Sequence, residues 1–472
     1  MKPTTSLSAA RRRRALVALV SLAALTSACT SIGDSGAPAR AADSSTKTPS
    51  TSSSSATSAP GSMIEQPVVT DIPVAADAKR VDLARPTFSD PTNVSNPLFP
   101  VSQQESILMV GHVDGKSFRT EVTLLPYTRV VTWGDQHIET LVSQYTAYLD
   151  GRIQEVAYDL YAQSDDGAVW YLGEDVADLE SGVITTKEGT WTAGVDGPPA
   201  MIMPGDPKVG QVHRTENIPG VAFEEITINA VDQTVKGPFG PVRGSLIATE
   251  LHMDAAKSPK VFAPGYGEFY SRDGKDVEAL AFAIPTNAKT EPTPGSLSRL
   301  ATASDRIDAA VDRRDWPKAT GVAHSMTQAW SRFSKGEVPW RIEPLMVRAV
   351  DGLDRAVARH DASAAHELAF EVASRSIDLE LLYQPAADVN VTRFDLWAGR
   401  LVDDSAAGDV AAVNGDLFTL EYIRDRILDG ATPADVAAAD TGLADVTTGV
   451  LDGNLHAAGK AAARLRTTIA AL

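Results

Sequence analysis

Cysteine is almost absent from this sequence, since Cys29 is the only one among 472 residues. A single cysteine excludes an intramolecular disulfide and every metal cluster built from several thiolates. Stretches rich in Lys and Arg are missing beyond residue 14, and acidic residues outnumber basic ones by 61 to 43. We therefore expect no binding to nucleic acid. No apolar run approaches the ~20 residues that a transmembrane helix needs.

Sequence signatures of catalysis and of cofactor binding are missing as well. The chain contains no phosphate-binding Gly-x-x-x-x-Gly-Lys-Ser/Thr loop and no Gly-x-Ser-x-Gly nucleophile motif. His366 opens a segment that lacks the second His of the zinc-protease motif, and His324 and Met326 are spaced too closely to share a helix face. A metal-binding helical bundle is therefore the least favoured function, and we predict no cofactor.

The N-terminus has the features of an export signal. Four arginines at positions 11–14 precede an uncharged apolar run over residues 15–25, which is the arrangement of a signal peptide. The run ends in Leu25-Thr26-Ser27-Ala28-Cys29, which resembles the lipobox of bacterial lipoproteins. The resemblance implies a signal peptide over residues 1–28 and lipidation of Cys29. The acyl chains would anchor the protein to the outer, extracytoplasmic face of the cell membrane.

Two segments without a regular apolar pattern follow the predicted anchor. Of residues 35–62, 14 are Ser or Thr, and such a segment buries too little apolar surface to fold. We predict a disordered tether over residues 29–62 and an extended lead-in over residues 63–94.

Charge is distributed unevenly along the chain. Removal of the signal peptide would leave 38 basic and 61 acidic side chains, a formal charge of −23. Residues 63–295 carry 17 basic and 33 acidic side chains. If the protein has a basic partner, we expect it to bind this region rather than residues 296–472.

Residues 95–288 are predicted to form a β domain. Apolar side chains recur with a period of two in several runs, including residues 156–162. Asp-Gly pairs, which supply the positive φ values of tight hairpin turns, separate the runs at Asp114-Gly115, Asp150-Gly151, Asp166-Gly167 and Asp273-Gly274. The pattern predicts an antiparallel meander, with a half-barrel or barrel as the first choice and a sandwich as the second.

The same region resembles a β-rich domain that recurs in exported bacterial proteins. The resemblance covers about residues 95–285 and depends on six segments: Asn96 to Pro100, Val169 to Val176, Glu188 to Trp191, Ala193 to Pro198, Met201 to Pro207 and Phe262 to Gly267. That family has no assigned activity, so the resemblance implies an exported β domain and no catalytic residues.

Residues 296–472 are predicted to form an up-and-down helical bundle, which makes the chain an α+β multidomain protein. Apolar residues step by three and four along several segments, and the clearest series is Leu451, Leu455, Ala458, Ala462, Leu465, Ile469 and Leu472. Asp315 precedes Trp316 and Pro317, a pattern typical of an N-cap followed by proline in the first helical turn.

One segment of the β region combines aromatic rings with carboxylates and supplies the candidate binding residues: Trp170, Tyr171, Glu174, Asp175, Trp191 and Asp196. An acid/base pair beside an aromatic platform would suit the hydrolysis of a glycan or an ester. The favoured interpretation is a turn whose aromatic rings fill the barrel wall and whose carboxylates are solvated. Adjacent strand residues point to opposite faces, so Glu174 and Asp175 are not expected to converge.

The function that we favour from the sequence is non-catalytic. We predict a lipid-anchored envelope protein that binds a small or apolar ligand in its β domain, or a partner protein at the envelope. A hydrolase that uses carboxylates of residues 170–196 is the alternative. Carboxylates that converge in a pocket would favour the hydrolase, and a smooth apolar cavity would favour the binding protein.

Overall fold

The computed structural model describes residues 63–64, 66–67, 69–70, 72–427 and 432–469. The predicted signal peptide, Cys29 and the Ser/Thr-rich tether lie outside the described residues. Most of the lead-in and nearly all of the two regions that follow it are described, so the fold prediction can be compared with the structure directly.

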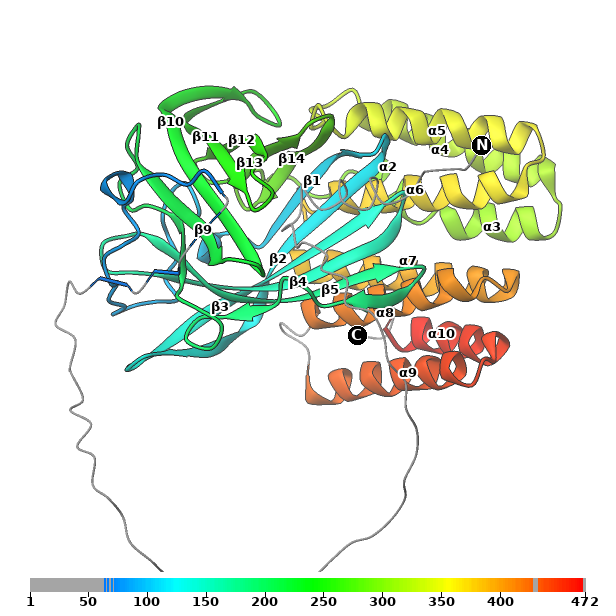
Figure 1. Ribbon diagram of the computed structural model, residues 1–472. Coiled ribbons are helices and arrows are strands. Elements are labelled where there is room, and N and C mark those ends of the chain that lie inside the picture. The colour runs from blue at the N-terminus through cyan, green and yellow to red at the C-terminus, as the bar shows by residue number, and fades with distance from the viewer. Residues whose placement is uncertain (1–62, 65, 68, 71, 428–431, 470–472) are drawn as a thin grey trace, which may run out of the picture.

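The β region forms one 14-stranded antiparallel sheet (Figure 1), which confirms the predicted meander. In chain order the strands are β1 (Ser106–Val113), β2 (Lys116–Trp133), β3 (Gln136–Leu149), β4 (Arg152–Gln163), β5 (Val169–Glu180), β6 (Val183–Thr186), β7 (Trp191–Thr192), β8 (Ala200–Met203), β9 (Val212–Ile218), β10 (Ala222–Lys236), β11 (Pro241–His252), β12 (Lys257–Ala263), β13 (Gly267–Asp273) and β14 (Asp276–Ile284). Across the sheet the order is β6-β5-β4-β3-β2-β1-β14-β13-β12-β11-β10-β9, and β7 and β8 both pair with β5.

The sheet curls until its two ends meet. The contact is made by His213 of β9, whose Nδ1 hydrogen-bonds to the carbonyl oxygen of Met201 of β8 at 2.8 Å. The lead-in covers the outer edge of β9, because the Val81 N–H donates to the Val212 carbonyl oxygen at 2.9 Å. A covered edge presents no free row of backbone groups to another strand.

The predicted Asp-Gly turns all connect neighbouring strands, but they differ in backbone conformation. Asp114-Gly115 and Asp150-Gly151 have positive φ at both residues, as a type I′ hairpin requires. At Asp166-Gly167 and Asp273-Gly274 only the glycine has a positive φ. The sequence pattern therefore locates all four turns and gives the tight type for two of them.

A β-bulge in β5 decides which side chains face the interior of the sheet. Tyr171 pairs with Tyr161 of β4 and Gly173 pairs with Leu160, so Leu172 is the extra residue. The bulge places Tyr171 and Glu174 on the same face, although their spacing of three would separate them on a regular strand.

The helices occupy the C-terminal region, as predicted. They are α2 (Gly295–Ala301), α3 (Ser304–Asp312), α4 (Trp316–Phe333), α5 (Glu343–Ala358), α6 (Ala362–Glu380), α7 (Ala386–Ala407), α8 (Val410–Arg426), α9 (Pro433–Leu451) and α10 (Leu455–Ile469). The predicted N-cap is confirmed, since the Asp315 side chain accepts a hydrogen bond from the Lys318 N–H. The predicted last helix is wrong at its start. Leu451 ends α9 and is 81% exposed, and a turn with Gly453 at φ +65° separates it from Leu455.

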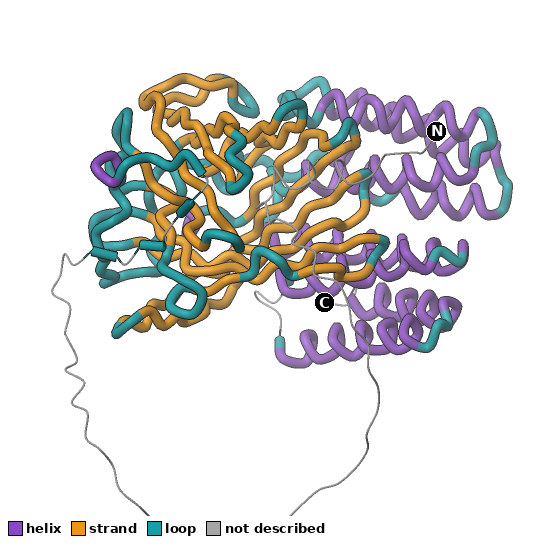
Figure 2. Tube along the Cα trace, viewed as in Figure 1, coloured by secondary structure: helices purple, strands orange, loops and turns teal. Residues whose placement is uncertain are grey.

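The helices pack against the outer face of the sheet, and Figures 1 and 2 show them together along one side of it. Leu108 and Val110 of β1 are buried in the same apolar core as residues of α2 to α6. Tyr148 of β3 stacks on Trp397 of α7 with ring centroids 5.5 Å apart. The two predicted regions therefore share apolar cores.

Buried ion pairs also join the sheet to the helices. Arg393 of α7 lies 3.3 Å from the Glu121 carboxylate of β2, and Arg426 at the end of α8 pairs with the same carboxylate. Burial opposes ionisation of Glu121, but the charges of Arg119, Arg393 and Arg426 outweigh it and hold its pKa well below the ordinary range.

Candidate functional site

The inner face of the curled sheet surrounds a cavity of about 190 Å³. Residues 107 and 109 of β1 show how the sheet builds it, because Ile107 and Met109 line the cavity while the alternating Leu108 and Val110 face the helices. Strands from both ends of the sheet contribute, so the cavity exists only because the sheet curls.

The wall of the cavity is strongly acidic. Among the described residues it contains one lysine, Lys260, and eight carboxyl groups: Glu155, Asp159, Glu174, Glu216, Glu224, Glu250, Glu268 and Glu278. Burial raises the pKa of Asp159 to about 7, against a smaller effect of its hydrogen bond from Tyr171. Burial, followed by the charge of Glu268, raises the pKa of Glu278 to about 8. Part of the wall therefore carries protons near neutral pH.

Asp159 and Glu174 meet at one tyrosine hydroxyl. The Tyr171 Oη lies 2.6 Å from Asp159 Oδ1 and 3.1 Å from Glu174 Oε2. A hydroxyl has a single proton, so it can donate to one carboxylate and must accept from the other. Burial and then the charge of Asp159 raise the pKa of Glu174 well above its ordinary value. The geometry thus favours a shared proton on this pair.

Glu216 of β9 is the carboxyl group with the least support from the protein. Its side chain is buried, and within the described part of the chain its Oε2 has no hydrogen-bond partner. Burial, then the charges of Glu224 and Glu174, raise its pKa well above the ordinary value. Such a buried acceptor lacks compensation for its desolvation unless a donor enters the cavity.

Glu174 has a second oxygen in nearly the same situation. Its Oε1 is buried and makes no hydrogen bond to any described residue. The Trp191 indole N–H is close enough to favour the ionised carboxylate slightly, but the two atoms do not meet the geometry of a hydrogen bond. Glu174 and Glu216 therefore both line the cavity, and each has one buried oxygen without a hydrogen-bond partner in the described structure.

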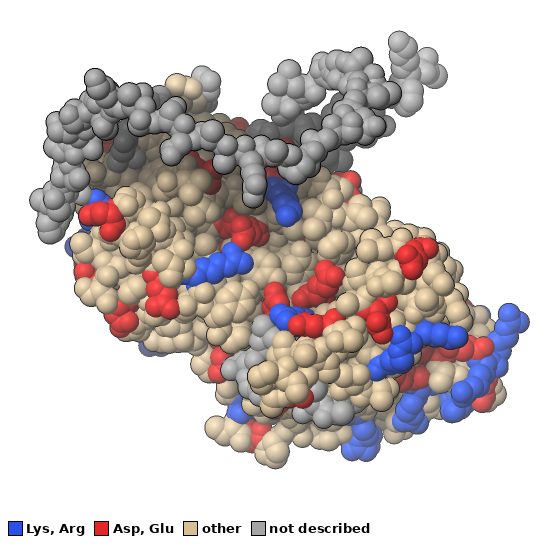
Figure 3. All heavy atoms as spheres, turned by 90° about the horizontal axis from the view of Figure 1, so that it is seen from below, with Lys and Arg blue, Asp and Glu red and all other residues tan. Residues whose placement is uncertain are grey.

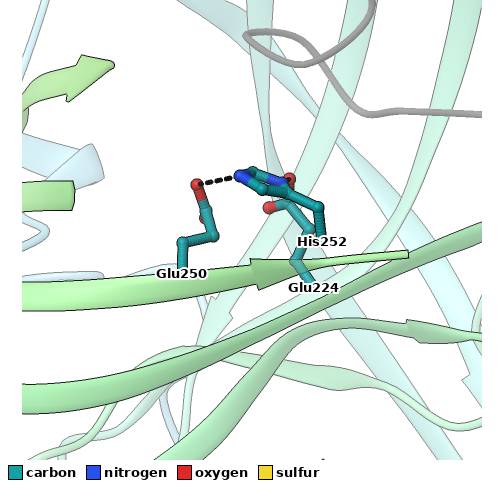
Figure 4. A group of neighbouring side chains, drawn as sticks. All are labelled: Glu224, Glu250 and His252. Carbon is teal, nitrogen blue, oxygen red and sulfur yellow. Dashed lines mark hydrogen bonds and ion pairs between the residues drawn. The ribbon is translucent and has the colours of Figure 1, made fainter. Parts of the chain in front are cut away.

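A lysine in the cavity wall and a histidine beside it supply positive charge. Figure 4 shows the His252 ring beside the carboxylates of Glu224 and Glu250. His252 Nδ1 lies 3.2 Å from Glu224 Oε1, its Nε2 lies 2.7 Å from Ser258 Oγ, and Lys260 Nζ lies 2.9 Å from Glu250 Oε1. Burial lowers the pKa of His252, but the hydrogen bond and charge of Glu224 outweigh it and raise the pKa to about 9.

The same group offers the donor set of a metal site. One ligand atom each from Glu224, Glu250 and His252 lies within 4.8 Å of the others. Both ring nitrogens of His252 already have partners, however, and Lys260 already pairs with Glu250. The imidazolium and the ammonium group thus fill the role of a metal cation in this arrangement.

Aromatic rings form part of the cavity wall, next to aliphatic side chains such as Ile107 and Met109. Tyr161 and Tyr171 stack with centroids 4.9 Å apart, and Phe99 contacts Tyr161 edge-on at 5.2 Å. Phe99 also lies 6.5 Å from Phe262. Carboxylates together with ring faces are the surroundings in which proteins hold organic cations.

The structure brings two of the predicted binding residues into the cavity and supports them with a third. Tyr171 and Glu174 line the cavity. Trp191 is fully buried and packs edge-on against Tyr171 at 5.4 Å. The prediction that Glu174 and Asp175 diverge is also confirmed, because Asp175 is exposed and pairs with Arg129 outside the cavity.

Three predicted residues lie away from the cavity. Trp170 is buried and donates from its indole N–H to Ser164 Oγ at 3.0 Å. Asp196 is exposed and accepts from the Thr192 N–H at 2.8 Å, which stabilises a turn. Asp175, as described above, faces solvent. These residues have structural roles that a sequence pattern of aromatic and acidic residues does not distinguish from binding.

Sequence reasoning missed most of the carboxyl groups in the cavity. Glu216 lies on β9 and Glu278 on β14, far along the chain from Glu174, and only the curl of the sheet brings them together. One signal was available. Glu155 and Asp159 occupy inward positions of β4, where a core-facing strand ordinarily carries apolar residues.

A second cluster lies in the helical region around His366. Its Nδ1 is 2.7 Å from Asp308 Oδ1, its Nε2 is 3.3 Å from Asp312 Oδ1, and Asp403 lies close enough to share a cation with Asp308 and His366. The hydrogen bond to Asp308 raises the pKa of His366. The protonated ring donates to both carboxylates, which accounts for the cluster without a metal. The partners lie on α3 and α7, so the sequence around His366 did not reveal them.

Comparison with known proteins adds no family to these observations. Neither the known protein-family models nor the curated proteins include a match to this chain. In the part of the chain that the structure describes, no helix is both long and apolar enough to cross a bilayer.

Proposed function

We propose that this protein is a lipid-anchored extracytoplasmic envelope protein that binds a small polar ligand in the cavity of its β sheet and does not convert it chemically. The observation that carries the proposal is a cavity lined by Glu174 and Glu216, each of which has one buried carboxyl oxygen without a hydrogen-bond partner among the described residues. Buried polar groups are almost always hydrogen-bonded. A bound ligand that donates to both oxygens would satisfy them.

The composition of the cavity narrows the range of ligands. Eight carboxyl groups among the described residues line it, so it is not the smooth apolar cavity that a lipid would require. The ligand expected from the sequence was small or apolar, and the wall favours the small polar one. The cavity volume of about 190 Å³ suits a molecule of a few heavy atoms.

Native mass spectrometry of the mature lipoprotein, purified from its own envelope in detergent, tests ligand binding. We expect an adduct of low mass that disappears on denaturation. Ala157 is buried and lines the cavity, so Ala157→Leu should reduce the adduct by filling space. Circular dichroism checks that this variant folds. Repeated adduct-free spectra of the wild-type protein would contradict ligand binding and favour a partner-protein role.

The anchor is tested separately from the cavity. The lipobox-like segment before Cys29 supports lipidation, and the thioether bond that holds a diacylglyceryl group requires the cysteine sulfur. We expect labelled palmitate in the wild-type protein and none in Cys29→Ser, which should move from the membrane fraction to the soluble fraction. Label that persists in Cys29→Ser would contradict the proposed anchor.

A hydrolase is the second candidate, and one observation favours it. Asp159 and Glu174 converge in the cavity, and their raised pKa values suit a general acid. The Tyr171 hydroxyl already fills the space between them, so a scissile bond has no place there without its movement. Turnover of a glycoside or ester that Glu174→Gln abolishes would establish the hydrolase. The absence of turnover on a broad substrate panel would retire it.

A further inference from the structure

We infer that the ligand of the cavity is a small organic cation whose primary ammonium group binds between Glu174 and Glu216. The inference rests on the proposed function and names the class of ligand for the same site. Three independent features support it: the balance of charge in the cavity, the position of the two carboxylates and the aromatic wall beside them.

The balance of charge leaves the cavity in need of a cation. Among the described residues that line it, eight carboxyl groups face a single lysine, Lys260. His252 adds one positive charge beside Glu224. Six of these eight carboxyl groups are buried, and Glu224 and Glu268 are partly buried. Two cations cannot neutralise them all, so the wall must hold protons, admit a further cation, or do both. A neutral or anionic ligand would leave this imbalance unchanged.

The position of Glu174 and Glu216 defines where that cation binds. Glu174 lies on β5 and Glu216 on β9, which belong to opposite ends of the sheet and come together where the sheet curls. Each has a buried oxygen without a hydrogen-bond partner among the described residues. The charge of Glu174 contributes to the raised pKa of Glu216, so the two carboxyl groups lie within electrostatic reach of one another. An ammonium group carries three donors and can serve both oxygens.

Lys260 shows that the cavity already accepts one ammonium group. Its Nζ pairs with Glu250 at 2.9 Å and with Glu268 at 3.3 Å. Burial opposes the charge of Lys260, but the carboxylates around it outweigh burial and raise its pKa well above the ordinary value. The carboxylates of Glu250 and Glu268 therefore pair directly with a cation of the protein itself. Glu174 and Glu216 form no ion pair with any described residue, although the charge of Lys260 slightly opposes the raised pKa of Glu216.

The aromatic wall favours an organic cation over a metal ion. Tyr171, whose hydroxyl contacts Glu174, stacks on Tyr161 and packs against Trp191. Methylene groups next to an ammonium group pack on such rings and add a cation–π attraction. Calcium and magnesium would instead require six or more oxygen ligands in a regular shell, for which the rings offer nothing.

Isothermal titration calorimetry of the full-length mature lipoprotein in detergent tests the inference. The organic probes share a four-carbon chain and differ in the charge of their end groups, and metal salts are compared with them. The probes are 1,4-diaminobutane and 1-aminobutane as cations, 1,4-butanediol as the neutral match, succinate as the anionic match, and calcium and zinc chloride. We expect both amines to bind, and the diol, the dicarboxylate and the metals to bind at least about tenfold more weakly.

Substitutions locate the ammonium group. Glu216→Gln and Glu174→Gln remove a charge with little change of shape, and each should weaken binding of 1-aminobutane about tenfold or more. Asp175→Asn is the matched control, because Asp175 is adjacent in sequence but exposed outside the cavity. It should bind the amine within about twofold of the wild type. Circular dichroism and thermal unfolding check that all three variants fold.

The outcomes separate this inference from the proposed function. Binding of the diol or the dicarboxylate in preference to the amines would overturn the inference and leave a ligand-binding protein. Preferential binding of calcium or zinc would overturn the inference in favour of a metal ion as the ligand. Amine binding that Glu174→Gln and Glu216→Gln leave unchanged would also overturn the inferred position. A natively purified protein without an adduct, and without affinity for any probe, would overturn the proposed function itself.

Discussion

Single residues in the cavity link its electrostatics to the stability of the protein. Asp159 and Glu278 have pKa values of about 7 and 8 in the fold, whereas carboxyl groups of an unfolded chain have pKa values of about 4. Between these values the folded state binds more protons than the unfolded state. The stabilisation from these groups is therefore complete below about pH 4 and is lost as the pH rises toward 8.

Glu278→Gln should reduce this pH dependence in the protein without ligand. Glutamine keeps an acceptor for Thr120 and carries no charge that burial would disfavour. We expect the decrease in unfolding free energy between pH 5 and pH 8.5 to shrink by about 1–3 kcal/mol relative to the wild type. Urea unfolding at the two pH values measures it. The control Asp206→Asn, at an exposed position, should match the wild type; an unchanged slope in Glu278→Gln would contradict the prediction.

Ligand affinity should depend on pH in the opposite direction. The titratable and charged side chains that line the cavity among the described residues are Tyr145, Glu155, Asp159, Tyr161, Tyr171, Glu174, Glu216, Glu224, Glu250, Lys260, Glu268 and Glu278, and His252 lies beside them, paired with Glu224. Carboxyl groups with raised pKa must lose protons before they hold a cation. Affinity for 1-aminobutane should therefore rise from pH 5.5 to pH 8, by up to about tenfold per pH unit for each proton released.

Calorimetry in two buffers of different ionisation enthalpy checks this prediction, because it counts the protons that leave when the amine binds. Release of about one proton or more at pH 7 is expected. A pH-independent affinity without proton release would show that the carboxylates are already ionised and paired.

The candidate residues show what a sequence can reveal at this scale. Tyr171, Glu174 and Trp191 were found because they lie close together in one motif-like segment. Glu216 was missed because its significance depends on a missing hydrogen-bond partner, which is a property of three-dimensional packing. Asp196 was included because the sequence alone does not distinguish an aspartate that stabilises an exposed turn from one that binds a ligand.

At the scale of elements, the bulge in β5 is the feature on which the cavity depends. Gly173 has φ +146°, and a Cβ there would lie 2.6 Å from the carbonyl oxygen of Trp191. The Trp191 backbone cannot move away without breaking its pairing with β5. Glycine at this position therefore allows the close approach that turns Glu174 toward the interior.

Gly173→Ala should destabilise the fold by about 2–4 kcal/mol, because it combines backbone strain with a steric clash. Gly210→Ala is the matched control, since Gly210 also has a positive φ, +87°, but open space around it. It should cost only about 1 kcal/mol, the backbone part alone. Thermal and urea unfolding compare the two. Equal losses of unfolding free energy in the two variants would show that the close contact at Gly173 does not affect stability.

Regular elements were predictable from periodicity, and irregular ones were not. The alternation over residues 156–162 identified β4, and Asp315 identified the start of α4. A bulge adds one residue without changing the local composition, so Leu172 gave no signal. The break between α9 and α10 was missed because Leu451 and Leu455 continue the helical spacing across a turn.

On the scale of the whole molecule, the sheet and the helices should unfold together. The Glu121 carboxylate is buried between them and pairs with arginines from β2, α7 and the end of α8. Removal of one member from a buried ion cluster leaves uncompensated charge, so Glu121→Gln should destabilise the protein by about 3–5 kcal/mol.

Tryptophan fluorescence and far-ultraviolet circular dichroism should report one coincident transition for the wild type and for Glu121→Gln. Arg464→Gln removes an exposed ion pair with Asp445 and should change stability by less than about 0.5 kcal/mol. Two separate transitions in the wild type would show that the sheet and the helices are independent units.

Part of the excess negative charge of the β region lies inside the sheet rather than on the protein surface. On the face drawn in Figure 3, most basic side chains lie toward the helical end, whereas acidic side chains are spread over the whole face. Eight of the carboxyl groups between residues 63 and 295 line the cavity within the described structure. The excess negative charge that predicted a basic partner therefore favours a small cation inside the sheet.

A crystal structure of the mature protein with 1-aminobutane would locate the bound ammonium group. We predict electron density for the amine in the cavity, with its nitrogen about 2.7–3.2 Å from oxygens of both Glu174 and Glu216 and its chain against Tyr171. Calorimetric saturation under the same conditions establishes that ligand is bound. An amine bound elsewhere, or a nitrogen that contacts neither carboxylate, would contradict this prediction.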